Sequence, residues 1–117
     1  MTTQVNYFEI GTQDPEGSKT FYNGLFGWGF GEPSPVGYRM INTDAGGMWD
    51  SGAVGGGHWA VFYVQVDDVA SSLAEAERLG ATVVIPLTNN GAIEFAHLGD
   101  PEGNRFGIWR PLGTPPE

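Results

Sequence analysis

The sequence predicts an α+β fold made of two successive modules, each with a strand, a helix and then further strands. A strand-like run followed by an aspartate-capped helix occurs twice, with Asp14 and Asp68 lying 54 positions apart. Each helical stretch ends at a glycine, Gly27 or Gly80, and short strand-like runs follow it. The chain has 117 residues, 40% of them hydrophobic, which suits one domain with a packed core. We therefore expect a single domain over residues 1–117, with one module at about 1–54 and the other at about 55–117.

The first module begins with a predicted strand over residues 5–10. Asp14 is placed to cap a helix whose first residue is Pro15, a position that favours proline. Large apolar side chains then recur at helical spacing: Phe21, Tyr22, Leu25 and Phe26. Short strands are expected over residues 38–42 and 48–49.

The second module repeats this plan with a predicted strand over residues 60–66. Asp67 and Asp68 offer the helix cap, and Arg78 falls in the last turn, where a cation suits the helix dipole. The apolar stripe of this helix is Val69, Leu73, Ala76 and Leu79. Three strands are expected after it, over residues 82–87, 94–98 and 105–109.

Glycine is abundant, with 19 residues, and it predicts tight turns or backbone that lies close to a ligand. The glycine-rich stretch 45–57 has no Gly-Lys-Ser/Thr ending, so we interpret it as a hairpin and a linker between modules. The proline-containing tail 111–117 is expected to be irregular.

The charge pattern argues against a nucleic-acid partner. The net charge is −9, and the five basic residues are scattered instead of forming a positive stripe. The absence of cysteine excludes disulfides and thiolate metal ligands. Neither a signal-peptide pattern nor a run long enough to span a bilayer is present, so a cytoplasmic protein with no membrane partner is expected.

The duplicated plan, together with the turn formed by Asp100, Pro101, Glu102, Gly103 and Asn104, resembles the vicinal-oxygen-chelate superfamily. This superfamily contains glyoxalases, bleomycin-resistance proteins and extradiol dioxygenases, and the resemblance covers nearly the whole chain. The run from Phe8 to Trp28 is similar to the bacterial glyoxalase-like branch. The resemblance implies two modules whose sheets form one cupped mixed sheet around a cleft, with helices outside, and it implies a homodimer.

Strand alternation assigns side chains to the expected cleft. In the first strand, Phe8 and Ile10 form the apolar pair under the helix, which turns the opposite face toward the cleft. The same reasoning places Phe62, Val64 and Val66 under the second helix, and Phe106 and Ile108 beside them. The expected ligand-binding residues are Tyr7, Glu9, Trp49, Val61, Tyr63, Gln65, Arg105 and Trp109.

The metal-ligand positions implied by the resemblance carry no suitable donors. They fall on Tyr7, on Val61, on Gly107 and on the strand through Gly47, Met48 and Trp49. A divalent metal needs several nitrogen or oxygen donors that converge. We therefore expect no metal and no other cofactor.

Two residues are candidates for acid–base chemistry. Glu9 in an aromatic cleft would be partly desolvated, which would raise its pKa toward values that suit a general base. The alternatives are an ion pair with Arg105 or a solvent-exposed position at the rim of the cleft. His97 is a candidate if it faces the cleft, but alternation over residues 93–98 leaves its face open, and a surface role is the alternative. His58 is expected outside the strand or on its opposite face.

These observations favour a protein that binds a small aromatic or amphipathic molecule in a metal-free cleft, as in bleomycin-type resistance. A metal-independent enzyme that uses Glu9 as general base is the alternative, with lyase, isomerase or hydroxylase-like chemistry. Metal-dependent glyoxalase or dioxygenase chemistry ranks third. Whether the protein is an enzyme is left open by the sequence.

Overall fold

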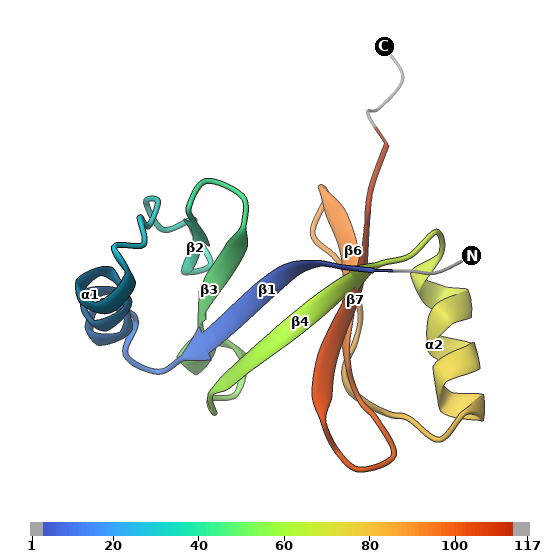
Figure 1. Cartoon of the computed structure of the whole chain (residues 1–117). Coiled ribbons are helices and arrows are strands. Elements are labelled where there is room, and N and C mark those ends of the chain that lie inside the picture. Colours follow the sequence, from blue (N-terminus) through green and yellow to red (C-terminus); the bar gives the residue numbers. More distant parts are fainter. Residues whose placement is uncertain (1–3, 114–117) are drawn as a thin grey trace. The chain divides into compact units, whose positions relative to one another are not determined.

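The computed structural model describes residues 4–113, and over this range the chain has the expected α+β architecture. The strands form a mixed sheet in the order β2-β3-β1-β4-β7-β6-β5. The elements are β1 (Val5–Thr12), α1 (Pro15–Phe26), β2 (Tyr38–Ile41), β3 (Gly46–Asp50), the short 3-10 helix η1 (Ser51–Val54), β4 (Trp59–Gln65), α2 (Val69–Arg78), β5 (Thr82–Asn89), β6 (Ile93–Gly99) and β7 (Arg105–Pro111) (Figure 1).

Contacts divide the chain into two compact units. One unit is Tyr7–Val61, and the other joins the residues before Tyr7 to those after Val61. Strands β1 and β4 each contribute residues to both units. The prediction of a single domain with a module boundary near residue 54 stays a prediction.

The helix caps follow the sequence prediction. The Asp14 side chain accepts a hydrogen bond from the Gly17 backbone N–H at 3.0 Å, and Gly27 ends α1 in the left-handed conformation with φ 74°. The Asp68 side chain accepts from the Ser71 N–H at 2.9 Å. Each cap supplies an acceptor to the unpaired first turn of its helix, so each aspartate fixes the residue at which its helix begins.

In the unit Tyr7–Val61, β1 pairs with β3 in parallel and β3 pairs with β2 antiparallel. Its core is Ile10, Ile41 and Met48, with Phe8, Tyr22, Trp28 and Phe30 packed against it. Helix α1 lies beside these strands (Figure 1), as the predicted orientation of Phe8 and Ile10 requires. Burying each such side chain stabilises the fold by about 1.5–3 kcal/mol.

The strands expected over residues 38–42 and 48–49 are present as β2 and β3, and β3 is longer than expected. Phe30 adds an isolated bridge to Ile41. The glycine-rich stretch 45–57, interpreted from the sequence as a hairpin and a linker, contains β3 and η1. Gly46 and Gly47 are β3 residues, and their backbone bonds to the neighbouring strands override the turn preference of glycine.

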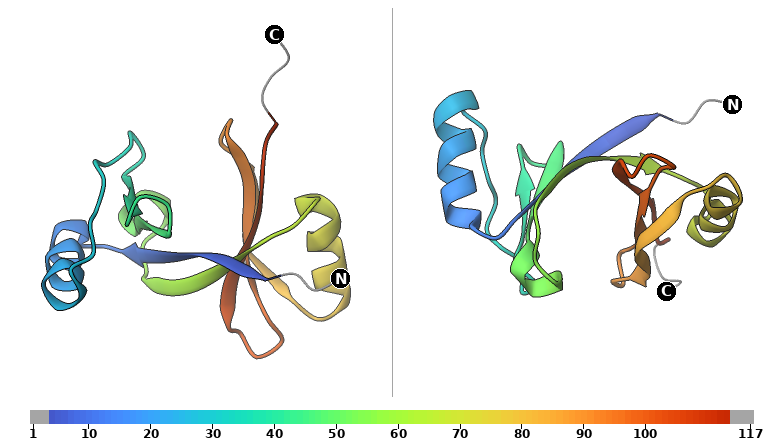
Figure 2. Two further views of the ribbon diagram at one scale, coloured as in Figure 1. Left: turned by 45° about the horizontal axis from the view of Figure 1, so that its top comes forward. Right: turned by 90° about the horizontal axis from the view of Figure 1, so that it is seen from below.

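In the other unit, β4 pairs with β7 in parallel, and β7-β6-β5 continue antiparallel. Helix α2 packs beside β5, β6 and β7 (Figure 2). The core is Val69, Ala96, Leu98 and Ile108, with Val66 and Phe106 among the residues packed against it. Phe62 stacks on Phe106 but remains 45% exposed, so it is not the buried residue expected under α2.

The turn that carries the family resemblance is held by its first residue. The Asp100 carboxylate accepts hydrogen bonds from the Glu102 N–H at 2.9 Å and from the Asn104 N–H at 2.9 Å, and also from the Asn104 amide. The side-chain and backbone hydrogen bonds from Asn104 hold the pKa of Asp100 below its usual value. This turn fixes the start of β7. Neither helix in the described part of the chain is long and apolar enough to cross a membrane.

Candidate functional site

Glu9 is the centre of a buried polar network in the unit Tyr7–Val61. Its side chain is only 3% exposed. The Tyr38 hydroxyl donates to Glu9 Oε1 at 3.0 Å, and the Trp59 indole N–H donates to Oε2 at 2.9 Å. Two aromatic donors therefore hold the two carboxylate oxygens from different strands, β2 and β4.

A second tyrosine extends the network. The Tyr7 and Tyr38 hydroxyls are 2.8 Å apart. Because Tyr38 gives its proton to Glu9, the hydroxyl of Tyr7 is the donor in the bond between the two tyrosines. The pKa of Tyr7 is raised to about 12. Burial is the main cause; the hydrogen bond with Tyr38 lowers the pKa, and the charge of Glu9 raises it. Tyr7 is therefore a protonated donor at neutral pH, and the stability that its hydroxyl contributes is lost only as the pH rises from about 10 to about 12.

Trp49 packs against both of the aromatic residues that donate hydrogen bonds to Glu9. Its ring makes edge contacts with Tyr38, with centroids 6.1 Å apart, and with Trp59, with centroids 6.3 Å apart. Edge-to-face pairs of this kind add about 0.5–1.5 kcal/mol each beyond the burial of apolar area. Val61, the remaining predicted site residue in this unit, is buried on β4.

A second polar cluster, in the other unit, contains His97, which is fully buried. The Arg105 Nε–H donates to His97 Nδ1 at 3.0 Å, and His97 Nε2 bonds to the Tyr63 hydroxyl. An arginine can only donate, so Nδ1 is the accepting nitrogen, and a neutral His97 carries its proton on Nε2. The tautomer of His97 is thus set by Arg105, and the imidazole donates to Tyr63.

The remaining predicted residues, Gln65 and Trp109, form a cluster with Asn6 in the same unit; Gln65 is exposed and Trp109 is half-buried. Asn6 donates through its amide to Gln65 Oε1 at 3.0 Å, and the Trp109 indole donates to Asn6 Oδ1 at 3.2 Å. Asn6, Tyr38 and Trp59 were missed by the sequence analysis. Alternation over residues 38–41 was the available signal for Tyr38, since Tyr38 and Met40 alternate there with Arg39 and the core residue Ile41.

Glycines make room for the aromatic rings of both units. A Cβ on Gly107 would lie 2.5–2.7 Å from three ring atoms of Tyr63, its register partner on β4. A Cβ on Gly47 would overlap the Tyr38 hydroxyl, and one on Gly11 would overlap the Trp59 indole. Real Cβ atoms do not approach so closely, so each ring requires glycine beneath it.

The same packing bears on metal binding. Gly107 is a position where the resemblance implies a metal ligand, and Gly47 lies on the strand through Trp49 that carries another; the space above each glycine is filled by a tyrosine. Among the described residues, no group of three or more His, Asp or Glu side chains is arranged to hold a metal ion. His58 is exposed and lies outside β4. The residues at the implied ligand positions therefore do not fit a divalent metal.

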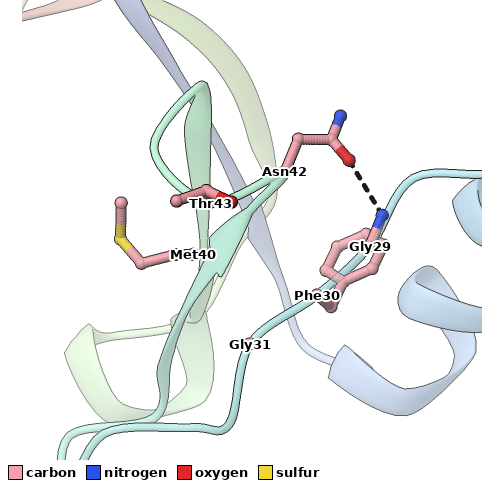
Figure 3. Close-up of a pocket in the computed structure, with 6 residues that line it drawn as sticks. All are labelled: Gly29, Phe30, Gly31, Met40, Asn42 and Thr43. Carbon is pink, nitrogen blue, oxygen red and sulfur yellow. Dashed lines mark hydrogen bonds between the residues drawn. The ribbon is translucent and has the colours of Figure 1, made fainter.

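An open hollow of about 490 Å³ lies at the edge of the unit Tyr7–Val61 (Figure 3). It is lined by Gly29, Phe30, Gly31, Met40, Asn42 and Thr43, and we call it the Met40 hollow. Its rim is tied together by Asn42, whose backbone N–H donates to the Gly29 carbonyl at 2.8 Å and whose side-chain oxygen accepts from the Gly29 N–H at 2.9 Å. Asn42 and Thr43 have φ of 50° and 73°, a conformation uncommon outside glycine that costs about 1–3 kcal/mol per residue.

A family model and two relatives each match most of this chain. The family model described as a glyoxalase-like domain matches residues 7–109. CFP32 of Mycobacterium bovis, which is named as a candidate glyoxylase, is 27% identical over 123 residues, covering 90% of this chain and 44% of that protein. The anthracycline biosynthesis protein DnrV of Streptomyces peucetius is 28% identical over 126 residues, covering 89% of this chain and 46% of that protein. The chain thus spans about half the length of these two relatives.

Among solved structures, the fold is similar to that of methylmalonyl-CoA epimerase from Streptomyces coelicolor in complex with 2-nitronate-propionyl-CoA. The TM-score is 0.62 at 14% identity, with 97% of this chain and 100% of that chain covered. At this level of identity the similarity supports the fold alone.

Proposed function

This chain belongs to the glyoxalase-like domain family, and from that premise we propose that it binds a small aromatic or amphipathic organic molecule without a metal. The observation that carries the proposal is Glu9, a buried carboxylate that two aromatic donors hold in place. An apolar, aromatic lining with a few placed polar groups is the usual form of a small-molecule site. Glu9 accepts hydrogen bonds, so it suits a ligand that carries a hydroxyl or N–H group.

The packing around the implied metal positions supports the metal-free part of the proposal. A carboxylate at Gly107 or Gly47 would need the volume that Tyr63 or Tyr38 fills. The relative named for anthracycline biosynthesis suggests a ligand class, fused aromatic rings with phenol and quinone oxygens. A suitable probe of that class is 1,4-dihydroxyanthraquinone.

We expect Glu9→Gln to weaken binding of 1,4-dihydroxyanthraquinone by roughly 10- to 100-fold. A hydrogen bond to a charged group contributes about 1.5–3 kcal/mol, and 1.4 kcal/mol corresponds to tenfold in affinity. Isothermal titration calorimetry measures the change. The matched control is Glu77→Gln, which removes an equal charge from the exposed surface of α2. Equal affinity in wild type and Glu9→Gln would contradict the role of Glu9.

Burial of a carboxylate among aromatic side chains also favours the second candidate, a metal-independent enzyme with Glu9 as general base. Its reaction would be of the lyase, isomerase or hydroxylase-like kind. The roles of His97 in acid–base chemistry, and of Glu9 paired with Arg105, stay predictions. Turnover that survives Glu9→Gln would rule out the general-base function while leaving the binding function open.

We also propose a homodimer, because the resemblance to the vicinal-oxygen-chelate superfamily implies one, and the family model supports that resemblance. The cytoplasmic location expected from the sequence stays a prediction. Light scattering after size-exclusion chromatography should give twice the mass of one chain at micromolar concentration. A mass of one chain over the same range would contradict the dimer.

A further inference from the structure

Met40 lies in the same row of side chains as Glu9. On neighbouring strands Met40 is the register partner of Gly47, and Gly47 is the register partner of Glu9. Side chains at directly opposed positions share one face of a sheet. Gly47 contributes no side chain to this row, and the Tyr38 hydroxyl fills the space between Met40 and Glu9.

Met40 lies at the solvent-exposed end of the row of side chains that contains Glu9. It is 37% exposed, whereas Glu9 is buried and Tyr7 and Tyr38 are partly buried. Met40 is one of the residues that line the Met40 hollow, and Figure 3 shows its side chain on the same side of the strand as Thr43, pointing away from Gly29 and Phe30. A ligand that enters from this edge would contact the thioether before it reached the tyrosines.

The Met40 thioether accepts only a weak hydrogen bond. The Tyr7 hydroxyl lies 3.6 Å from Met40 Sδ, but the same hydroxyl has a better acceptor in Tyr38 at 2.8 Å. One proton serves both contacts, and sulfur is the weaker acceptor. Displacing Met40 therefore leaves the bond between the tyrosines intact.

We propose that Met40 is a specificity-determining residue of the Glu9 site, where its movable thioether packs against the ring of an aromatic ligand. This inference rests on the function proposed above. Methionine suits the role because its side chain is flexible and its sulfur makes favourable contacts with aromatic rings. The ligand class it selects is planar and aromatic, with a hydroxyl group directed toward the tyrosines and Glu9.

Methyl NMR of protein labelled with [¹³C-methyl]methionine tests the inference directly. Met48 is the internal control, because it is 1% exposed in the core of the same unit. The Met40 signal is assigned from its loss in Met40→Leu. Adding 1,4-dihydroxyanthraquinone should shift the Met40 methyl signal progressively and leave the Met48 signal in place. Met40→Ala should weaken binding of this probe about tenfold, while Met40→Leu, which keeps the apolar bulk, should weaken it less.

The outcomes separate the two proposals. If the probe binds in a Glu9-dependent manner while the Met40 signal stays unmoved, the Glu9 site stands and the role of Met40 is overturned. Equal movement of the Met40 and Met48 signals would also overturn it, because a general change of the fold would then explain the shift. If calorimetry detects no binding of the probe to wild type, the proposed function fails for this ligand class, and the inference about Met40 fails with it.

Discussion

Gly107→Ala is expected to destabilise the protein by about 3 kcal/mol, the upper part of the range for overpacking a buried site. The added methyl group would lie 2.5–2.7 Å from the ring of Tyr63. That ring cannot move cheaply, because it is 4% exposed and its hydroxyl is bonded to His97. Thermal unfolding should show a fall in Tm on the order of 10 °C.

The matched control for Gly107→Ala is Gly24→Ala in α1, where an added Cβ meets nothing within 4 Å. There the change should stabilise by about 0.5–1 kcal/mol, because alanine favours a helix more than glycine does. A double-mutant cycle adds a stricter check: Gly107→Ala should cost much less in a Tyr63→Ala background. A small cost in the wild-type background would show that Tyr63 does not need this glycine.

The second large effect is expected for Gly11→Ala, which should also cost about 3 kcal/mol. Here the added methyl group would overlap the indole of Trp59, a residue only 9% exposed. Displacing this ring breaks the hydrogen bond from the indole N–H to Glu9 Oε2. Chemical denaturation measures the stability, and the Trp59 indole N–H signal in an NMR spectrum should move from its wild-type position.

Gly31→Ala is the control for this effect, because a Cβ at Gly31 makes only ordinary contacts, at 3.8 Å and beyond. It should leave both the stability and the Trp59 signal nearly unchanged. An unmoved Trp59 signal in Gly11→Ala would contradict the packing of this ring against β1.

The starts of the helices and the end of the first helix were predictable, because they depend on residues that are close together in the sequence. Asp14 and Asp68 cap their helices as expected, and Gly27 ends the first helix. The role of the strand glycines was not predictable, since it depends on which ring lies above each one. Gly107 is covered by a tyrosine 44 positions earlier in the chain, and no local pattern reveals that pairing.

The candidate site was only partly predictable for the same reason. Alternation in β1 correctly separated Phe8 and Ile10, which pack in the core, from Glu9. The residues that donate hydrogen bonds to Glu9 are Tyr38 and Trp59, and both come from other strands. The face of His97 could not be predicted, because β6 is buried on both sides from Phe95 to Gly99. A strand with two buried faces gives no alternation to read.

Calorimetric titration of 1,4-dihydroxyanthraquinone into protein dialysed against EDTA tests whether Glu9 belongs to a metal-free ligand site. We expect binding of one ligand per chain with the same affinity before and after chelation, with elemental analysis of the dialysed sample confirming removal of zinc, nickel, manganese and iron. Binding that disappears on chelation and returns when one of these ions is added back would contradict the metal-free site.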